Sequence, residues 1–370
     1  MSQANRQPER LRVGIVGAGI GAGYAAAFQQ VEAVDVAAIC ARSSARAAPL
    51  AQKYHIPAVY TDYEAMLAQE PLDIVVVATP NNLHYPMTLT ALEAGKHVIC
   101  DKPLAMNAEQ AHALAARANA LRRRHFVPFV WRFLPAAAYM KELIDAGAVG
   151  ETYHVYVRYF NLGWGDAQGP MRWQYDRAQA GSGALGNLGS HAIHLIHWWL
   201  GGIHRVCAHL TTVVKTRALP EGGQSPVTVD DHCAFLGELD GGVPLVFSAS
   251  SVAHVARVNV EIGVFGGDGS LVFRDDWAMD DAWIGRIDAM RKGDSVPTRV
   301  PIPARLTGEF RHMPDYTTPM RGCFARMAAE FAGAIREDRA ASPNFHDGAQ
   351  VQAVMDAVLQ SAAEARWVTI

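Results

Sequence analysis

Residues 11–22 read LRVGIVGAGIGA, and this stretch decides the fold. Residues 11–16 form an apolar run that predicts a buried strand. Small residues then follow in the order G-x-G-x-x-A, at Gly17, Gly19 and Ala22. Glycines at such positions let the backbone turn tightly and approach a pyrophosphate, and a helix is expected next, at residues 24–31. Alone, the pattern is a weak signal, because glycine-rich turns after strands are common.

Three more apolar runs predict strands of the same sheet, at residues 34–40, 73–78 and 96–100. The last two end in short polar segments marked by proline, which are Thr79-Pro80-Asn81-Asn82-Leu83-His84 and Asp101-Lys102-Pro103. Ligands bind at the carboxyl ends of the strands in open α/β sheets, so the glycine turn and these two segments are expected to form one site. A phosphate-binding turn combined with a lysine indicates a nicotinamide-dinucleotide enzyme.

The end of the second predicted strand bears on the choice between NAD and NADP. An NAD site usually places Asp or Glu there to hold the ribose 2′-hydroxyl, whereas this chain has Arg42 and Ser43. A guanidinium and a hydroxyl suit a 2′-phosphate, so we expect NAD(P) as the cofactor, with a preference for NADP. The alternative is that Arg42 is a solvated loop residue.

Four features together resemble the Gfo/Idh/MocA family of NAD(P)-dependent oxidoreductases, the glucose-fructose oxidoreductase and inositol dehydrogenase type. They are the N-terminal glycine turn, the T-P-N-x-x-H segment, Asp101-Lys102-Pro103 in place of E-K-P, and the G-x-H helix start at Gly189-Ser190-His191. The resemblance runs over essentially the whole chain, as far as Pro343-x-Phe345-x-Asp347-Gly348. It implies an α/β fold in two domains. Residues 1–125 would form a Rossmann doubly wound parallel sheet, and residues 126–370 an α+β domain with an open, mostly antiparallel sheet. As an alternative, the last helices of the chain pack back on the first domain.

The sequence pattern after residue 125 changes to a period of two. A strand at residues 126–131 and a helix at residues 136–145 are expected first. Turn residues then separate β-rich runs, as in an antiparallel meander, at residues 153–160, 207–214, 229–239, 243–250, 257–265 and 270–274. Closing helices are expected at residues 321–337 and 348–366. The resemblance implies helices on one face of this sheet and a second subunit on the other, in a homo-oligomer that is a dimer or a tetramer.

Residues 180–200 concentrate the chemistry of the second half. A glycine-rich loop leads into a helix, and Asn187, His191 and His194 share one face if the helix begins near Asn187. By the resemblance, His191 matches the family's acid/base histidine, the partner of the lysine that is Lys102 here. The family usually has an Asp four residues before this histidine and often another three residues after it. This chain departs from that pattern, with Asn187 and His194 at those positions.

Oxidation of a hydroxyl needs a base for the proton while hydride leaves the same carbon. Histidine has a pKa in the right range, and Lys102 beside the substrate oxygen would stabilise a developing alkoxide. Asn187 can accept a hydrogen bond but supplies no charge. Two outcomes stay open for the catalytic set Lys102, His191 and Asn187. Either His191 works with a lowered pKa, or Lys102 is the main acid/base and His191 positions the substrate.

The other site residues are predicted from their position or from the resemblance. The predicted dinucleotide contacts are Gly17, Gly19, Ile20, Gly21, Arg42, Ser43, Thr79, Pro80, Asn82, His84, Asp101, Lys102 and Trp173. The predicted substrate contacts are Arg132, Trp164, Trp173 and His194. Ordinary packing is the alternative for Trp173 and for His194. No metal site is expected, because no carboxylate lies between the three histidines of the helix.

Composition and charge exclude several other classes of protein. A net charge of −3 with 19% charged residues gives no sign of a nucleic-acid or membrane surface. The five cysteines lack CxxC spacing, which suits a reducing cytoplasm, and the polar start MSQANRQPER does not read as a secretory signal. We therefore expect a cytoplasmic enzyme whose partner is a small-molecule sugar or polyol.

The expected reaction is hydride transfer between NAD(P) and a carbinol or keto carbon of a sugar, cyclitol or related polyol. Two alternatives stay open. The family also includes glycosidases that keep the dinucleotide bound and cleave a glycosidic bond by transient oxidation. A non-catalytic dinucleotide-binding sensor gains weight from the missing Asp at position 187, although a sensor has no need of both Lys102 and His191.

Overall fold

The computed structural model describes residues 10–162, 166, 168–254, 258–276, 284–308 and 318–370. Within them the chain forms two compact units. The first comprises Met1–Ala105, Glu109–Pro128 and Arg321–Asp347, and the second comprises Met106–Ala108, Phe129–Met320 and Gly348–Ile370. A segment from the end of the chain therefore belongs to the same unit as the glycine turn.

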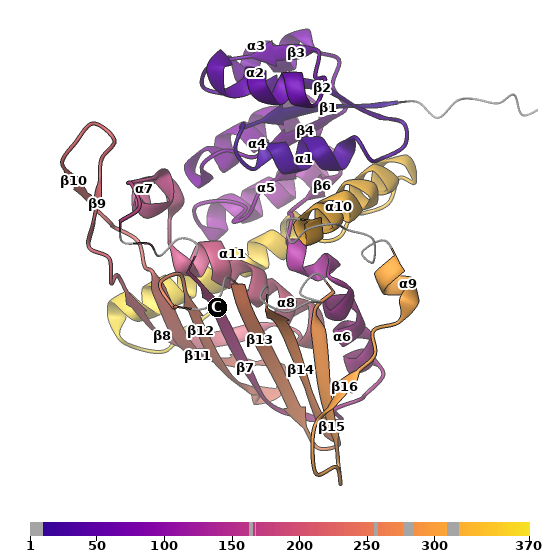
Figure 1. Ribbon diagram of the computed structural model, residues 1–370, viewed down its shortest axis with the longest axis vertical. Helices are drawn as coiled ribbons and strands as arrows, with labels where there is room; N and C mark the ends of the chain where they lie inside the picture. Colours follow the sequence, from indigo (N-terminus) through magenta and orange to yellow (C-terminus); the bar gives the residue numbers. More distant parts are fainter. Residues whose placement is uncertain (1–9, 163–165, 167, 255–257, 277–283, 309–317) are drawn as a thin grey trace, which may run out of the picture. The chain divides into compact units, whose positions relative to one another are not determined.

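The first unit is built on a six-stranded sheet in the order β3-β2-β1-β4-β5-β6, with all neighbouring strands parallel (Figure 1). The strands are β1 (Leu11–Val16), β2 (Val34–Cys40), β3 (Ala58–Tyr60), β4 (Ile74–Val77), β5 (His97–Cys100) and β6 (His125–Phe126). This order is that of a Rossmann fold, in which β1, β2 and β3 extend the sheet to one side and β4, β5 and β6 extend it to the other side of β1. The predicted Rossmann sheet is confirmed, and β1 and β2 have the predicted bounds.

In the described part of the first unit, five helices alternate with the strands and a sixth comes from the end of the chain. They are α1 (Gly21–Phe28), α2 (Ser44–Lys53), α3 (Tyr63–Gln69), α4 (His84–Glu93), α5 (Ala108–Ala120) and most of α10 (Thr318–Arg336). The helix predicted at residues 24–31 was placed three residues too late. The amides of Ala22 and Gly23 donate to the carbonyls of Gly19 and Ile20, so the glycine turn itself begins the helix.

The second unit is built on a nine-stranded sheet in the order β16-β15-β14-β13-β7-β12-β11-β8-β17. Every neighbouring pair is antiparallel except β7 and β12, which are parallel, so the predicted mostly antiparallel sheet is confirmed. The strands are β7 (Thr152–Asn161), β8 (Ile203–Thr211), β11 (His232–Leu239), β12 (Pro244–Ser250), β13 (Val258–Gly266), β14 (Gly269–Asp276), β15 (Arg286–Arg291), β16 (Thr298–Val300) and β17 (Val368–Thr369). A separate ribbon pairs β9 (Thr216–Ala218) with β10 (Gln224–Pro226).

The helices of the second unit are α6 (Pro135–Asp145), α7 (Arg177–Ala180), α8 (Ser190–Leu200), α9 (Ala304–Thr307) and α11 (Phe345–Glu364). Of these, α6 packs against β14 and β15, and Ser361 of α11 accepts a hydrogen bond at 2.9 Å from the amide of Ala208 in β8. Trp199 of α8 packs edge-on against Phe273 of β14, with ring centroids 5.6 Å apart. No helix of the described ranges is long and apolar enough to cross a membrane, and all five cysteines are free thiols.

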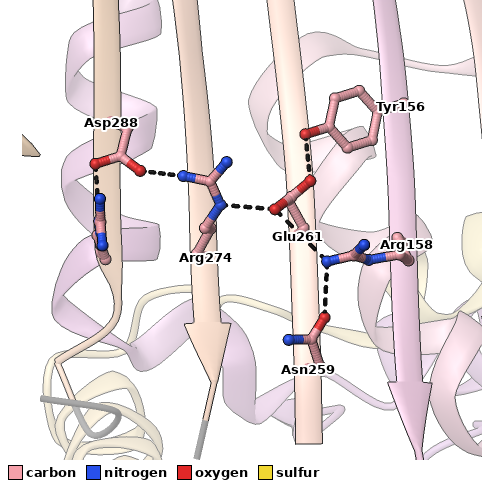
Figure 2. Close-up of polar contacts among 7 residues, drawn as sticks. Tyr156, Arg158, Asn259, Glu261, Arg274 and Asp288 are labelled. Atoms are coloured by element: carbon pink, nitrogen blue, oxygen red, sulfur yellow. Dashed lines mark hydrogen bonds and ion pairs between the residues drawn. The ribbon is translucent and has the colours of Figure 1, made fainter. Parts of the chain in front are cut away.

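The opposite face of the sheet carries a polar ladder and an exposed apolar pair. Figure 2 shows Glu261 at the centre of the ladder, where it accepts hydrogen bonds from Tyr156 Oη at 2.5 Å and from Arg274 Nε at 2.6 Å. Arg274 also pairs with Asp288, so opposite charges alternate across three neighbouring strands. On the same face, Leu236 and Val246 are opposite each other on β11 and β12, and each is about half exposed.

The strand predicted at residues 126–131 is wrong beyond its first residue. Only His125–Phe126 pair with β5, and Val130–Phe133 form a 3₁₀ turn. Pro128 lacks a backbone N–H for a sheet ladder, which explains the early end of the strand. Two other boundaries also move, because β8 begins at Ile203 and β11 begins only at His232. Residue 257, where another strand was predicted to begin, lies outside the described residues.

Candidate active site

The first unit brings three of the predicted segments together at the carboxyl ends of β1, β4 and β5. The amide of Gly17 donates to the carbonyl of Cys40 at 2.9 Å, at the end of β2. A Cβ atom on Gly17 would lie 2.1 Å from the carbonyl oxygen of Ala78, directly after β4. The amide of Asp101 in turn donates to Val77 at 2.9 Å. The glycine turn therefore touches the Thr79-Pro80 segment, whose strand is paired with the one that leads to Lys102.

His84 joins the two proline-marked segments from within. Its side chain is fully buried, and Nδ1 lies 2.7 Å from the carbonyl oxygen of Pro103, while Nε2 lies 3.0 Å from that of Thr79. A neutral imidazole can donate only one of these two hydrogen bonds. Burial lowers the pKa of His84, and the negative charge of Asp101 opposes this shift. The ring of His84 therefore links the Thr79-Pro80 segment to the Asp101-Lys102-Pro103 segment and stabilises both.

Lys102 stands at the end of β5 beside a carboxylate. The protein around it displaces water and lowers the pKa of Lys102 to about 8, although the residue keeps some solvent contact and the charge of Asp101 opposes the shift. Asp101 accepts a hydrogen bond from the Lys102 amide at 2.7 Å, and burial raises the pKa of Asp101. Burial, together with the negative charge of the nearby Asp101, raises the pKa of the Tyr24 hydroxyl. Lys102 can thus exchange a proton near neutral pH.

The remaining dinucleotide candidates of the first unit lie on its surface or in its turns. A Cβ on Gly19 would meet no atom within 4 Å, and Ile20 is 47% exposed. Arg42, Ser43 and Asn82 are exposed, while Thr79 and Pro80 are partly buried. Ser43 precedes α2 with extended backbone angles, and its hydroxyl makes no capping hydrogen bond. The open space at Gly19 and the exposed groups after β2 fit an approaching dinucleotide.

In the second unit, His191 lies in the first turn of α8, directly after a π-helical turn, Leu185–Gly189. Asn187 is the middle residue of that turn, so the two side chains belong to one continuous helical segment. Turns of this type are rare in proteins, and those that occur are often found at functional sites. The prediction placed Asn187 and His191 on one face of a regular α-helix. In the structure the helical segment is continuous, but Asn187 lies in its π turn and only His191 lies in α8.

The aromatic residues that follow Pro128 hold the ring of His191. Phe129 and Trp131 both meet it edge-on, with centroid separations of 6.2 and 6.3 Å and interplanar angles of 82° and 81°. Trp131 is itself edge-on to Tyr159 at 5.7 Å. His191 is only 6% exposed. Sequence reasoning missed Phe129 and Trp131, because their run was read as a strand, although two aromatic residues beside a proline could have signalled packing.

His194 is packed more deeply than a surface contact would be. It is 1% exposed and stacks on Phe129, with ring centroids 4.2 Å apart and an interplanar angle of 10°. Burial lowers the pKa of His194 far below its usual range, and the charge of Arg132 adds to this. Arg132 lies over the ring of Trp198 at 4.3 Å. A neutral, stacked His194 supplies shape and a ring nitrogen rather than charge.

Trp173 lies on a separate loop of the second unit. It begins a 3₁₀ turn, Trp173–Tyr175, and is partly buried. The carbonyl of Tyr175 accepts a hydrogen bond from the amide of Thr228 at 3.0 Å, and the guanidinium of Arg217 lies over the Tyr175 ring at 3.9 Å. Trp164, the other predicted aromatic contact, lies outside the described residues.

Two family models match this chain. Residues 11–129 match the oxidoreductase family with an NAD-binding Rossmann fold, and residues 137–272 match the GFO/IDH/MocA C-terminal domain. Levoglucosan dehydrogenase of Pseudarthrobacter phenanthrenivorans is 29% identical, and the match covers 98% of each chain.

Solved structures agree with this match. A complex of levoglucosan dehydrogenase with NADH and L-sorbose has a TM-score of 0.89 and 28% identity, and it covers 98% of this chain and 99% of that one. An oxidoreductase domain protein from Kribbella flavida has the same TM-score and coverage, with 30% identity. Together with the Rossmann sheet and the Lys102 segment, these matches show that the chain belongs to the GFO/IDH/MocA family of NAD(P)-dependent oxidoreductases.

Proposed function

We propose that this enzyme transfers a hydride between the nicotinamide C4 of NAD(P) and a carbinol carbon of a sugar, cyclitol or related polyol. The observation that carries the proposal is Lys102, at the carboxyl end of β5, with a pKa lowered to about 8 in a family of oxidoreductases. A sugar-like substrate is supported by the relative named for levoglucosan and by the complex that holds L-sorbose.

Lys102 and His191 divide the handling of the hydroxyl proton in this proposal. In the oxidative direction, the neutral amine of Lys102 accepts the proton at Nζ as the C–H bond breaks. His191 holds the substrate hydroxyl through a ring nitrogen, with Asn187 in support. The bound dinucleotide supplies the acceptor for the hydride, which leaves with the electron pair of the C–H bond. In the reductive direction, the Lys102 ammonium returns the proton to the carbonyl oxygen.

The dinucleotide is held by backbone and side-chain groups of the first unit. The glycine turn at residues 17–21 would hold the pyrophosphate, and the Thr79-Pro80 and Asp101-Lys102 segments would hold the nicotinamide end. Asn82 and His84 belong to the first of these segments, and the His84 ring contacts the carbonyl oxygens of Thr79 and Pro103. Trp173, Arg132, His194 and Trp164 are proposed to contact the nicotinamide or the substrate.

Arg42 and Ser43 are proposed to give the enzyme a preference for NADP. Arg42→Ala is expected to weaken NADPH binding about 10- to 100-fold, because a charge-assisted contact with the 2′-phosphate is lost. NADH binding should change by less than about threefold, since NADH has no phosphate there. Fluorescence titration of both cofactors measures the two Kd values, and exposed Arg46 supplies the control variant Arg46→Ala. An equal loss for both cofactors would contradict the assignment.

A cofactor and substrate screen tests the reaction itself. Purified protein, checked for carried-over cofactor, is titrated with NAD(H) and NADP(H). Both forms are then used with levoglucosan, D-glucose, D-xylose and myo-inositol, with absorbance of the reduced nicotinamide as the readout. Turnover of a polyol supports the proposal. A bound cofactor that never exchanges would favour the glycosidase alternative, and absence of dinucleotide binding would refute the central claim.

We also propose a division of labour, with residues 1–125 binding the dinucleotide and residues 126–370 binding substrate and a second subunit, although residues 321–347 belong to the first unit. The sheet face opposite the helices carries the exposed pair Leu236 and Val246 and a ladder of paired charges. The double variant Leu236→Glu/Val246→Glu is expected to sediment as a monomer, because it places charge in an apolar contact. Val296→Glu, at an exposed residue outside the strands, should sediment as the wild type does. A wild type that is itself monomeric would refute this interface.

A further inference from the structure

We propose that Asp230 is a positioning residue for His191, because its carboxylate fixes the start of the helical segment that carries Asn187 and His191. The inference rests on the proposed function of His191. Asp230 lies in the loop before β11, about forty residues after the histidine. The sequence pattern gave no sign of its role.

The contacts of Asp230 converge on the glycine-rich loop. Its carboxylate is buried, with the residue 4% exposed, and accepts hydrogen bonds from the amides of Gly183 at 2.7 Å and Leu185 at 2.8 Å. Its own carbonyl accepts one from the amide of Ala184 at 2.9 Å. A Cβ on Gly183 would lie 1.7 Å from that carbonyl oxygen. Only glycine allows this approach, so three successive amides of the loop are bound to one residue.

Hydrogen bonds connect the loop at residues 183–185 to the catalytic segment, which is the π turn and α8 with Asn187 and His191. The carbonyl of Gly183 accepts the amide of Asn187 at 2.8 Å, and the π turn continues without a break into α8. Ser190 Oγ then donates to the carbonyl of Gly186 at 2.6 Å, next to His191. Each residue of a helix is fixed by hydrogen bonds to the preceding turn. The hydrogen bonds to Asp230 therefore fix the start of this segment, at residues 183–185, and with it the place of Asn187 and His191.

The negative charge of Asp230 also favours its position beside the amides at the start of the helical segment. A carboxylate at the N-terminal end of a helical segment satisfies free amides and is favoured by the helix dipole. Burial raises the pKa of Asp230, and its hydrogen bonds from Gly183 and Leu185 oppose that shift. Position 187, by contrast, holds an uncharged amide. The negative charge associated with this segment is thus supplied from the β11 side.

The same loop also holds the Trp173 segment. Thr228 donates its amide to the carbonyl of Tyr175, and its Oγ accepts the amide of Arg177 at 2.8 Å. Residues 228–230 therefore hold both the loop of Trp173 and the helix of His191. These are two of the segments that the proposed function assigns to substrate.

Asp231 provides a control that is matched in chemistry and burial. It is 6% exposed, and its carboxylate accepts the amides of Val213 at 2.7 and 2.8 Å and of Val214 at 2.8 Å. Those amides belong to the chain after β8 and not to the catalytic segment. Asp230→Asn and Asp231→Asn each replace a carboxylate that binds two amides with a group of the same size. The amide offers only one acceptor oxygen.

The test compares these two variants in the full-length enzyme. Turnover is measured with the cofactor and polyol that the screen identifies, starting from levoglucosan. We expect kcat for Asp230→Asn to fall about 10²-fold, the usual effect of a small misplacement of a catalytic group. The dinucleotide Kd should stay within about twofold, because the proposed phosphate contacts all lie in the first unit. For Asp231→Asn, kcat should stay within about threefold of wild type, since its amides lie outside the catalytic segment.

A second readout needs no substrate. Histidine labelled with ¹³C at Cε1 reports the pH titration of His191, whose resonance is assigned by its loss in His191→Asn. Asp230→Asn should shift that titration midpoint and speed amide exchange at Gly183 and Leu185, whereas Asp231→Asn should do neither. If Asp230→Asn does not fold, Asp230→Ser keeps one acceptor at a position where serine is a good cap.

The outcomes separate this proposal from the proposed function. A wild type that turns over no polyol counts against the function, and the His191 titration then still decides the role of Asp230. An unchanged titration and unchanged exchange in Asp230→Asn would overturn the positioning role. Equal losses of kcat in the two variants would overturn it too, because they would mark a general loss of packing.

Discussion

Lys102→Ala lowers the rate of polyol oxidation by about 10²- to 10⁴-fold, the range expected when a positioned acid/base group is removed. The dinucleotide Kd should change by less than about threefold, because the phosphates are proposed to be held by the glycine turn and not by Lys102. Steady-state rates and a cofactor titration on the same preparation give both numbers. The matched control is Lys292→Ala, at an exposed lysine in the turn after β15, which should keep the wild-type rate.

The pH dependence gives the same prediction a second test. Only the neutral amine accepts a proton, and the pKa of Lys102 is lowered to about 8. In the wild type, kcat/KM for oxidation should therefore rise as the pH increases toward about 8 and level off above it. The residual activity of Lys102→Ala should lack that rise. A variant with the wild-type rate and the wild-type profile would show that another group takes the proton.

Gly17→Ala is expected to destabilise the protein by at least about 3 kcal/mol, which combines backbone strain with a steric clash. Gly17 has φ +107°, and a Cβ there would lie 2.1 Å from the carbonyl oxygen of Ala78 and 2.7 Å from its carbon. Both atoms are backbone atoms next to β4, so relief requires β1 and β4 to separate. Chemical unfolding followed by circular dichroism measures the change.

Gly19→Ala is the matched variant in the same turn. Its Cβ would meet no protein atom within 4 Å, so the unfolding midpoint should stay close to wild type. The added methyl nevertheless occupies space that the pyrophosphate is proposed to approach, so the dinucleotide Kd should rise. The pair thus separates a glycine needed for the fold from one needed for the ligand. Gly17→Ala unfolding at the wild-type midpoint, or Gly19→Ala binding with the wild-type Kd, would contradict this division.

The sequence by itself determined the framework of the first unit. β1 and β2 have their predicted bounds, and the glycine turn, the Thr79-Pro80 segment and Lys102 fall at strand ends as expected. These features are local, because a run of apolar β-branched residues and the glycine or proline that ends it lie next to each other in the chain. Parallel strands then carry such ends to one edge of the sheet. The hairpin between β11 and β12 was predictable for the same reason.

The tertiary structure alone decided which distant groups support the site. His84 reaches the carbonyl of Pro103 across 19 residues, and Asp230 reaches the amide of Gly183 across 47. Phe129 and Trp131 leave the predicted strand to hold the ring of His191. Propensity and spacing describe neighbours along the chain, whereas a buried carboxylate or ring takes the partners that packing brings to it.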